Sequence, residues 1–275
     1  MDNYTTNKER PLKLLSCSQV PVTASFALKW GICGGTFDPP HMGHLVMAEA
    51  ARAQLGLDEV LFMPAAQPPH KQGKKISATE HRVAMVREAI ADHEHFRLST
   101  FEVTREGANY TVETMRLLRE KWGDKVELFF IMGGDSLLDL PIWYKPQDLI
   151  QLVNLAVIAR PGYHADIDVL ERTLPGIRQR LYFARAPLIG ISSTDIRQRV
   201  QKGDTIRYLV PRGVERYIYE QGLYGPSARH FGSEGLLPDE PGARHFGSDG
   251  HLPDGPSARH FGSDGHFPDG PPKIE

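Results

Sequence analysis

The stretch Gly34-Gly35-Thr36-Phe37-Asp38-Pro39-Pro40-His41-Met42-Gly43-His44 separates two segments of different character. The apolar run Phe26–Cys33 before it predicts a β-strand, and the periodic stretch Leu45–Leu55 after it predicts an α-helix. The two glycines allow backbone amides to approach a ligand closely, and His41 and His44 lie one helical turn apart on one face. Because a helix N-terminus attracts anions, the stretch predicts a binding site for a nucleotide phosphate.

A second candidate phosphate site lies near residue 190. The segment Ile191-Ser192-Ser193-Thr194-Asp195-Ile196-Arg197 follows the apolar residues 187–190. Hydroxyl side chains at a helix start cap the helix, and they can equally donate hydrogen bonds to phosphate oxygens. Arg197 lies one turn further along, where its guanidinium can reach a β- or γ-phosphate.

Together these two motifs resemble a known superfamily. A His-x-Gly-His at the first strand–helix turn, followed by a Ser/Thr-rich second motif, is similar to the nucleotidyltransferases, and the whole string Gly34–His44 resembles the bacterial nicotinate-nucleotide adenylyltransferases. The resemblance implies an enzyme of NAD biosynthesis that transfers the adenylyl group of ATP to nicotinate mononucleotide, giving nicotinate adenine dinucleotide and pyrophosphate. It also implies Mg²⁺, carried by the ATP phosphates without a direct protein ligand.

The resemblance assigns roles to residues at matching positions. Trp143 matches the family's pyridine-stacking tryptophan, and Lys71 matches a lysine near the ATP phosphates. Asp135 also follows a predicted strand, which is where an α/β sheet places ligand-contacting groups. The implied catalytic residues are His41, His44 and Arg197. The implied ATP-binding residues are Gly34, Gly35, Thr36, Phe37, Lys71, Ile191, Ser192, Ser193 and Thr194. The implied nicotinate mononucleotide-binding residues are Asn109, Tyr110, Thr111, Asp135, Trp143, Tyr144 and Arg160.

The chemistry of this reaction agrees with the residue types. The attacking group is a phosphate, which is already anionic near neutrality because its second pKa is about 6. No serine, cysteine or general base is needed to make a nucleophile. We therefore expect catalysis by positioning and by stabilisation of the charge that develops on the α-phosphate and on the departing pyrophosphate.

Alternating apolar and helical patterns predict an α/β fold, a doubly wound, Rossmann-like parallel sheet with helices on both faces. A capping box at Ser77–Glu80 predicts a helix that starts at Ser77, and Pro211 opens a final helix. The further predicted strands are Val60–Met63, Phe96–Ser99, Val126–Met132, Asn154–Ala159 and Leu181–Phe183.

The composition is typical of a cytoplasmic enzyme. The chain has 275 residues, 40% of them hydrophobic and 24% charged, and a net charge of −2 that does not favour nucleic-acid binding. No apolar run approaches the roughly 20 residues that span a bilayer. The two cysteines, Cys17 and Cys33, are too few for a disulfide framework. An exposed thiol at Cys33, directly before the predicted phosphate turn (residues 34–44), would make the protein sensitive to oxidation.

Three regions follow from these patterns: an N-terminal extension over residues 1–26, a nucleotidyltransferase domain over 27–224, and repeats over 225–275. In the last region Ala-Arg-His-Phe-Gly-Ser recurs at Ala228, Ala243 and Ala258, a period of 15 residues. One Phe-centred cluster per repeat cannot offset chain entropy, so we expect disorder there and a flexible extension at the N-terminus. Neither is expected to be needed for catalysis, and the tail's partner and any homo-oligomer are left open.

Two alternatives stay open at this point. The acceptor can be nicotinamide mononucleotide, because nicotinate and nicotinamide differ by one charged group. It can also be another phosphate, since pantetheine-phosphate adenylyltransferases and cytidylyltransferases share the His-x-Gly-His and the Ser/Thr-rich second motif. The Pro-Pro-His form and the pairs Asn109-Tyr110 and Trp143-Tyr144 argue against those two relatives. The other alternative is a nucleotide-binding regulator whose tail recruits a partner. That alternative predicts a damaged phosphate site, whereas both histidines, Lys71 and Arg197 are present.

Overall fold

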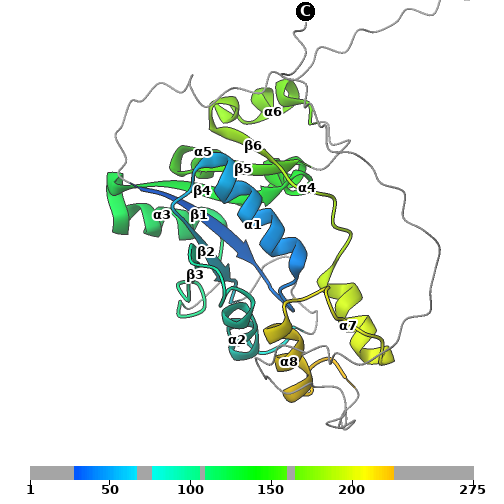
Figure 1. The fold of residues 1–275 in the computed structure, drawn as a ribbon. Helices are drawn as coiled ribbons and strands as arrows, with labels where there is room; N and C mark the ends of the chain where they lie inside the picture. Colours follow the sequence, from blue (N-terminus) through cyan, green and yellow to red (C-terminus); the bar gives the residue numbers. More distant parts are fainter. Residues whose placement is uncertain (1–27, 67–75, 106–108, 160–164, 226–275) are drawn as a thin grey trace, which may run out of the picture. The chain divides into compact units, whose positions relative to one another are not determined.

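The computed structural model describes residues 28–66, 76–105, 109–159 and 165–225 (Figure 1). The strands among them form one parallel sheet in the order β3-β2-β1-β4-β5-β6, which confirms the predicted doubly wound fold. The bounds of the strands are β1 Leu28–Gly35, β2 Glu59–Pro64, β3 Phe96–Leu98, β4 Val126–Gly133, β5 Asn154–Ala159 and β6 Leu181–Arg185.

Helices cover the sheet on both faces, and α1 runs across one of them (Figure 1). The α-helices are α1 Met42–Leu55, α2 Thr79–Ala89, α3 Thr111–Trp122, α4 Gly134–Asp139, α5 Pro146–Leu152, α6 Ile167–Thr173, α7 Ser193–Lys202 and α8 Arg212–Glu220. The short 3-10 helices are η2 Gly123–Lys125, η3 Leu140–Ile142 and η4 Ile177–Arg180.

The apolar side chains of β4 alternate between two separate cores. Phe129 and Ile131 pack with residues of α1, α2, α7 and α8, whereas Leu128, Phe130 and Met132 pack with residues of α3, α4, α5 and α6. A strand that is buried on both faces needs apolar residues at every position, because successive side chains point to opposite faces. The continuous apolar runs in the sequence therefore reflect a sheet between two helical layers.

The order of the strands reverses at β1, which pairs with β2 on one side and with β4 on the other. In an open α/β sheet, the crevice outside the carboxyl ends of the strands at such a switch point is the usual ligand site. The carboxyl end of β1 is Gly35, so the turn quoted above begins at this crevice.

Two local expectations were wrong. The helix α2 begins at Thr79, and its N-cap residue Ala78 makes no side-chain capping bond. Ser77 precedes this N-cap residue; its backbone amide donates to Asp38 Oδ2 (3.2 Å) and its carbonyl accepts from Arg82 Nε (3.2 Å). Cys33 is not an exposed thiol: it is 1% exposed, and burial raises its pKa to about 12. At that pKa the sulfur stays protonated and poorly reactive.

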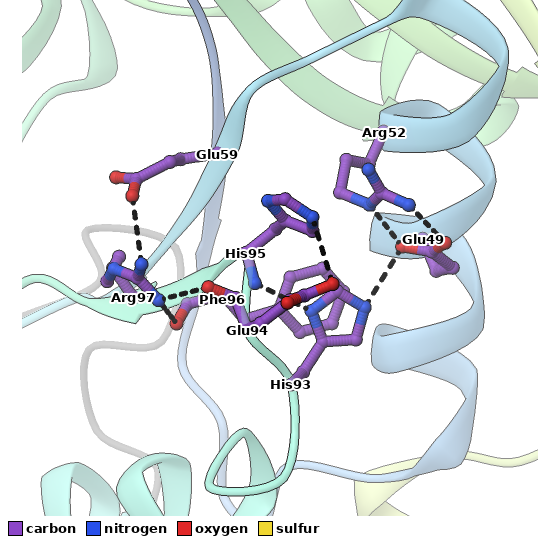
Figure 2. Close-up of polar contacts among 8 residues, drawn as sticks. All are labelled: Glu49, Arg52, Glu59, His93, Glu94, His95, Phe96 and Arg97. Atoms are coloured by element: carbon purple, nitrogen blue, oxygen red, sulfur yellow. Dashed lines mark hydrogen bonds and ion pairs between the residues drawn. The ribbon is translucent and has the colours of Figure 1, made fainter.

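A polar cluster ties the segment before β3 to α1 (Figure 2). Glu49 of α1 accepts two hydrogen bonds from Arg52, at 2.7 and 2.8 Å, and its Oε2 lies 3.2 Å from Nε2 of His93. The His93 ring also stacks on Phe96, with the ring centroids 3.7 Å apart. These contacts brace the edge strand against the helix that carries His44.

None of the helices in the described ranges is both long and apolar enough to cross a membrane. The predictions for Lys71, for Arg160, for the N-terminal extension and for the 15-residue repeats lie outside the described residues. The division of the chain near residues 27 and 224 stays a prediction.

Candidate active site

Two stacked imidazoles stand at the start of α1. His41 is the N-cap residue and His44 lies in the first turn, and their ring centroids are 3.7 Å apart with 29° between the planes. The backbone amide of His41 donates to Nδ1 of His44 at 3.1 Å. Because that nitrogen accepts, the neutral His44 ring carries its proton on Nε2, which is then a hydrogen-bond donor.

His41 is neutral, and its position at a helix start acts in the same direction because the N-terminal end of a helix disfavours a cation. Its side chain is 7% exposed, and this burial lowers its pKa from 6.5 to about 4. Within the described part of the chain, Nδ1 of His41 is buried and makes no hydrogen bond. A buried polar atom without a partner is uncommon in folded proteins and is explained when a ligand completes it.

The residues between β1 and α1 pack against these imidazole rings. The ring of Phe37 is buried and meets the His44 ring edge-on, with centroids 5.0 Å apart. A Cβ on Gly35 would lie 3.1 Å from the Phe37 ring, so this glycine leaves room for the aromatic ring. The backbone amide of Met42 donates to the carbonyl of Leu209 at 3.0 Å, so that one of the first amides of α1 has a protein partner.

The first turn of α7 is hydrogen-bonded to the turn before α1. Ser192 caps α7, since its Oγ accepts from the amide of Asp195 at 3.1 Å. Ser193 Oγ donates to the carbonyl of Pro39 at 2.9 Å, and Arg197 Nη1 donates to the carbonyl of Asp38 at 2.6 Å. The second amino group of Arg197 donates to Thr194 Oγ1 at 3.3 Å. The two motifs, more than 150 residues apart in sequence, therefore meet at one place.

Two buried charged residues in this region were not among the predicted site residues. Asp38 is 4% exposed, and its carboxylate accepts from the amide of Ser77 (3.2 Å) and from the hydroxyl of Tyr224 (2.6 Å). Arg82, which is 1% exposed, makes five hydrogen bonds, and burial lowers its pKa. Its acceptors are the carbonyls of Thr36 (3.0 Å), Ala65 (2.6 Å), Ala66 (3.1 Å) and Ser77 (3.2 Å) and the hydroxyl of Thr79 (3.0 Å).

The sequence does contain a signal for Arg82. It lies three, four and seven residues before Met85, Val86 and Ala89, which are the buried positions of α2. A charged residue in the apolar stripe of an amphipathic helix is expected to have buried partners.

A group of aromatic residues lies on the β4 side of the switch point. Trp143 meets Phe130 of β4 edge-on, with ring centroids 6.0 Å apart, and the rings of Tyr110 and Tyr144 lie 4.3 Å apart. A Cβ on Gly34 would lie 3.5 Å from the Phe130 ring. Phe130 therefore lies between the backbone of the phosphate turn and the aromatic group.

The polar residues that were predicted to bind nicotinate mononucleotide differ from one another in their exposure. Asp135 is exposed in the first turn of α4, directly after β4, and Thr111 is the first residue of α3. Asn109 is buried instead: its Nδ2 donates to the carbonyl of Glu102 at 3.0 Å, and its Oδ1 accepts from Arg105 at 3.3 Å. The amide of Asn109 thus supports the segment that precedes Tyr110.

Known proteins resemble this chain in sequence and in fold. The sequence model of the cytidylyltransferase-like family matches residues 32–199. A probable nicotinate-nucleotide adenylyltransferase of Thermomicrobium roseum is 47% identical over 194 residues, which are 70% of this chain and 90% of that protein. A protein of the same name from Lactiplantibacillus plantarum is 48% identical over 204 residues, covering 74% of this chain and 91% of that one.

The solved structures extend the likeness to the fold. Nicotinic acid mononucleotide adenylyltransferase of Plasmodium falciparum, complexed with NaAD, superposes with a TM-score of 0.60 at 20% identity and covers 72% of this chain and 97% of its own. The same enzyme complexed with APC gives a TM-score of 0.59 at 19% identity, with the same coverage.

Proposed function

Since this chain belongs to the nicotinate-nucleotide adenylyltransferase family, within the cytidylyltransferase-like proteins, we propose that it joins ATP and nicotinate mononucleotide into nicotinate adenine dinucleotide and releases pyrophosphate. The observation that carries the proposal is the junction of the two phosphate motifs. Arg197 and Ser193 of α7 bind the turn that presents His41 and His44, at the switch point of the sheet. This arrangement supports the proposal, because cationic and neutral donors of both motifs would surround one polyphosphate bound there.

The reaction breaks one phosphorus–oxygen bond and forms another. A phosphate oxygen of nicotinate mononucleotide attacks the α-phosphorus of ATP, and the bond to the bridging oxygen of the β-phosphate breaks. Pyrophosphate leaves with that electron pair, so no protein group needs to accept a proton from the nucleophile. The protein's task is to bring two polyanions together and to stabilise the charge that develops between them.

The three proposed catalytic residues supply different donors. Nε2–H of His44 would donate to an oxygen of the α-phosphate. The buried Nδ1 of the neutral His41 would carry its proton and donate it to a triphosphate oxygen. Arg197 supplies the permanent positive charge. Its bonds to Asp38 and Thr194 fix the guanidinium so that its other N–H groups can face the leaving pyrophosphate.

Mg²⁺ fits this site as a companion of the triphosphate. The side chains at the junction are imidazole, guanidinium and hydroxyl groups, which suit phosphate oxygens better than they suit a hard cation. When bound to ATP, Mg²⁺ would neutralise part of the charge on the leaving group. We propose in addition that Lys71 contacts the ATP phosphates and that Arg160 contacts nicotinate mononucleotide.

The aromatic group around Trp143 is the proposed nicotinate pocket. A pyridine ring would stack on Trp143, and Tyr110 and Tyr144 would border it. The side chain of Asp135 is exposed at the carboxyl end of β4, where it would accept hydrogen bonds from ribose hydroxyls. Asn109 and Thr111 are proposed to shape this pocket.

Location in the cytoplasm and the formation of an oligomer stay predictions.

Pyrophosphate release tests the proposal directly. Mg-ATP would be combined in turn with nicotinate mononucleotide, nicotinamide mononucleotide and phosphopantetheine, with wild type and with His44→Ala. We expect turnover with nicotinate mononucleotide alone, about a hundred- to a thousand-fold slower in His44→Ala. Turnover with a different acceptor would contradict the proposed substrate and leave the proposed mechanism of adenylyl transfer intact. ATP binding without turnover would favour a regulator.

A truncation separates the domain from its tail. A chain that ends after Tyr224 retains every described contact of the junction. We expect it to turn over nicotinate mononucleotide at the wild-type rate. A clear loss of activity would assign the repeats a role in catalysis.

A further inference from the structure

The hydroxyl of Tyr224 lies at the far end of the described chain, yet it binds the phosphate turn. It donates to Oδ1 of Asp38 at 2.6 Å across a sequence separation of 186 residues. We propose that Tyr224 is a positioning residue for adenylyl transfer, acting through Asp38 on the turn that carries His41 and receives Arg197. This inference rests on the proposed function for its readout of rate.

Asp38 is the point at which three distant segments meet. Its carboxylate accepts from Tyr224 through Oδ1 and from the backbone amide of Ser77 through Oδ2 (3.2 Å), and its carbonyl accepts from Arg197 (2.6 Å). The carboxylate is 4% exposed, so water does not replace a lost donor easily. Removal of one of two donors to a buried carboxylate leaves an acceptor unpaired and allows the turn to move.

The phenol of Tyr224 stays protonated and can therefore donate a hydrogen bond at any physiological pH. Burial and the neighbouring Asp38 carboxylate raise the pKa of Tyr224 far above its ordinary value, so its proton stays on the oxygen at physiological pH. The ring also packs against the core that contains α2 and α8, and its oxygen lies 3.7 Å from Sδ of Met85. The ring position is therefore fixed apart from the hydrogen bond, and the hydroxyl can be removed without removing the packing.

The backbone at Tyr224 is strained, and its surroundings must stabilise that strain. Tyr224 has a φ of 63°, in the left-handed region that residues other than glycine rarely adopt. The turn that follows α8 leads to this conformation, with the amide of Gly222 bonded to Tyr219 and the amide of Leu223 bonded to Ile218. Strain of this kind persists only where surrounding contacts stabilise it, and the bond to Asp38 is one such contact.

The chain offers a matched control in Tyr217 of α8. Its hydroxyl makes a hydrogen bond of 3.0 Å with Nδ1 of His81 and so joins α8 to α2, without touching Asp38. Tyr224→Phe and Tyr217→Phe each remove one hydroxyl from the same part of the fold. The first removes the bond to Asp38 and the weak contact with Sδ of Met85, and the second removes the bond to His81. Only the first of them alters the support of the phosphate turn.

The experiment compares both variants in the full-length chain by kcat, by KM for ATP and by hydrogen exchange of residues 36–44. For Tyr224→Phe we expect kcat to fall about tenfold or more, because small displacements of reacting groups are costly. We also expect faster exchange in residues 36–44, together with a change in KM of less than about threefold. Tyr217→Phe should keep kcat within about twofold of wild type and leave the exchange of the turn unchanged.

A double variant tests whether Tyr224 acts through Asp38. If it does, Tyr224→Phe combined with Asp38→Asn loses no more activity than Asp38→Asn alone, because the two changes disrupt one interaction. Additive losses would overturn the proposal, as would equal rates and equal exchange in Tyr224→Phe and Tyr217→Phe. The exchange measurement needs no substrate. A wild-type protein without turnover would therefore count against the proposed function, whereas unchanged exchange would count against the positioning role.

Discussion

A Cβ on Gly43 would lie 3.0 Å from Nδ1 and 3.1 Å from Cε1 of His41. Gly43 is the second residue of α1 and has no left-handed backbone, so conformation does not explain this glycine. The stacked imidazole of His41 occupies the space that a side chain would fill. The glycine of the His-x-Gly-His motif is therefore explained by the packing of the first histidine.

Gly43→Ala should separate activity from stability. The methyl group pushes the His41 ring away from its stack on His44, and we expect kcat to fall about ten- to a hundred-fold. Alanine in a helix also gains about 0.5–1 kcal/mol over glycine, which offsets part of the crowding. The free energy of unfolding should change little. Pyrophosphate release and thermal melting measure the two quantities, and a variant that retains kcat but melts far lower would contradict this account.

Arg82→Met should destabilise the fold strongly. The variant leaves the carbonyls of Thr36, Ala65, Ala66 and Ser77 without their shared donor in a buried place. We expect the free energy of unfolding to fall by about 3–5 kcal/mol, the size typical of a disrupted buried charged network. Denaturation in urea, followed by circular dichroism, measures the change.

Arg116→Met provides the matched control for this prediction. Arg116 forms an exposed ion pair with Asp148, with Nη2 and Oδ2 3.3 Å apart. Exposed pairs contribute about 0–1 kcal/mol, so this variant should unfold close to wild type. Equal losses in the two variants would show that the five hydrogen bonds of Arg82 contribute no more than a surface pair.

The sequence predicts the strands well because their apolar runs are continuous. For β5 the predicted and observed bounds coincide at Asn154–Ala159, and β4 extends only one residue beyond the predicted Val126–Met132. The two phosphate motifs could also be placed, since each follows an apolar segment and opens a helix. Local patterns of this kind depend on residues that are close in sequence.

The support of the site could not be predicted in the same way. The contact between Asp38 and Tyr224 depends on where α8 ends in space, and no pattern relates residues 186 positions apart. Ser77 shows the opposite error: its local pattern predicts the start of a helix there, whereas α2 begins at Thr79 and the Ser77 backbone amide bonds to the distant Asp38. The geometry of buried hydrogen bonds follows from packing, which a single sequence does not display.

Burial of His41 predicts that stability depends on pH between about 4 and 6.5. The folded-state pKa of about 4 lies below the unfolded value of 6.5, so the unfolded chain binds more protons in this interval. The stabilisation is complete above pH 6.5 and is lost as the pH falls towards 4. The wild type should lose about 2 kcal/mol from this residue at pH 5 relative to pH 7.5.

The variant His41→Asn isolates that contribution. Unfolding in urea at pH 7.5 and at pH 5 should show a smaller loss for the variant than for wild type, by about 2 kcal/mol. Below pH 4.5 the comparison is less simple, because Glu49, whose pKa is lowered by its hydrogen bond from Arg52, also loses its stabilising charge there. Parallel losses in the two proteins at pH 5 would show that His41 is not held neutral by burial.

Trp143→Ala should affect one substrate and spare the other. In the proposed pocket its ring would stack on the pyridine of nicotinate mononucleotide, whereas the proposed site of the ATP phosphates is the junction of α1 and α7. Loss of one aromatic stack corresponds to about 1 kcal/mol or somewhat more, so KM for nicotinate mononucleotide should rise about tenfold. KM for ATP should stay within about twofold.

The control is Trp122→Ala, which removes a tryptophan that packs edge-on against Trp30, with the ring centroids 4.7 Å apart. The Trp122→Ala variant should melt at a lower temperature with both KM values unchanged. A rise in both KM values for Trp143→Ala would instead argue that the Trp143 ring stabilises the fold and does not bind nicotinate mononucleotide.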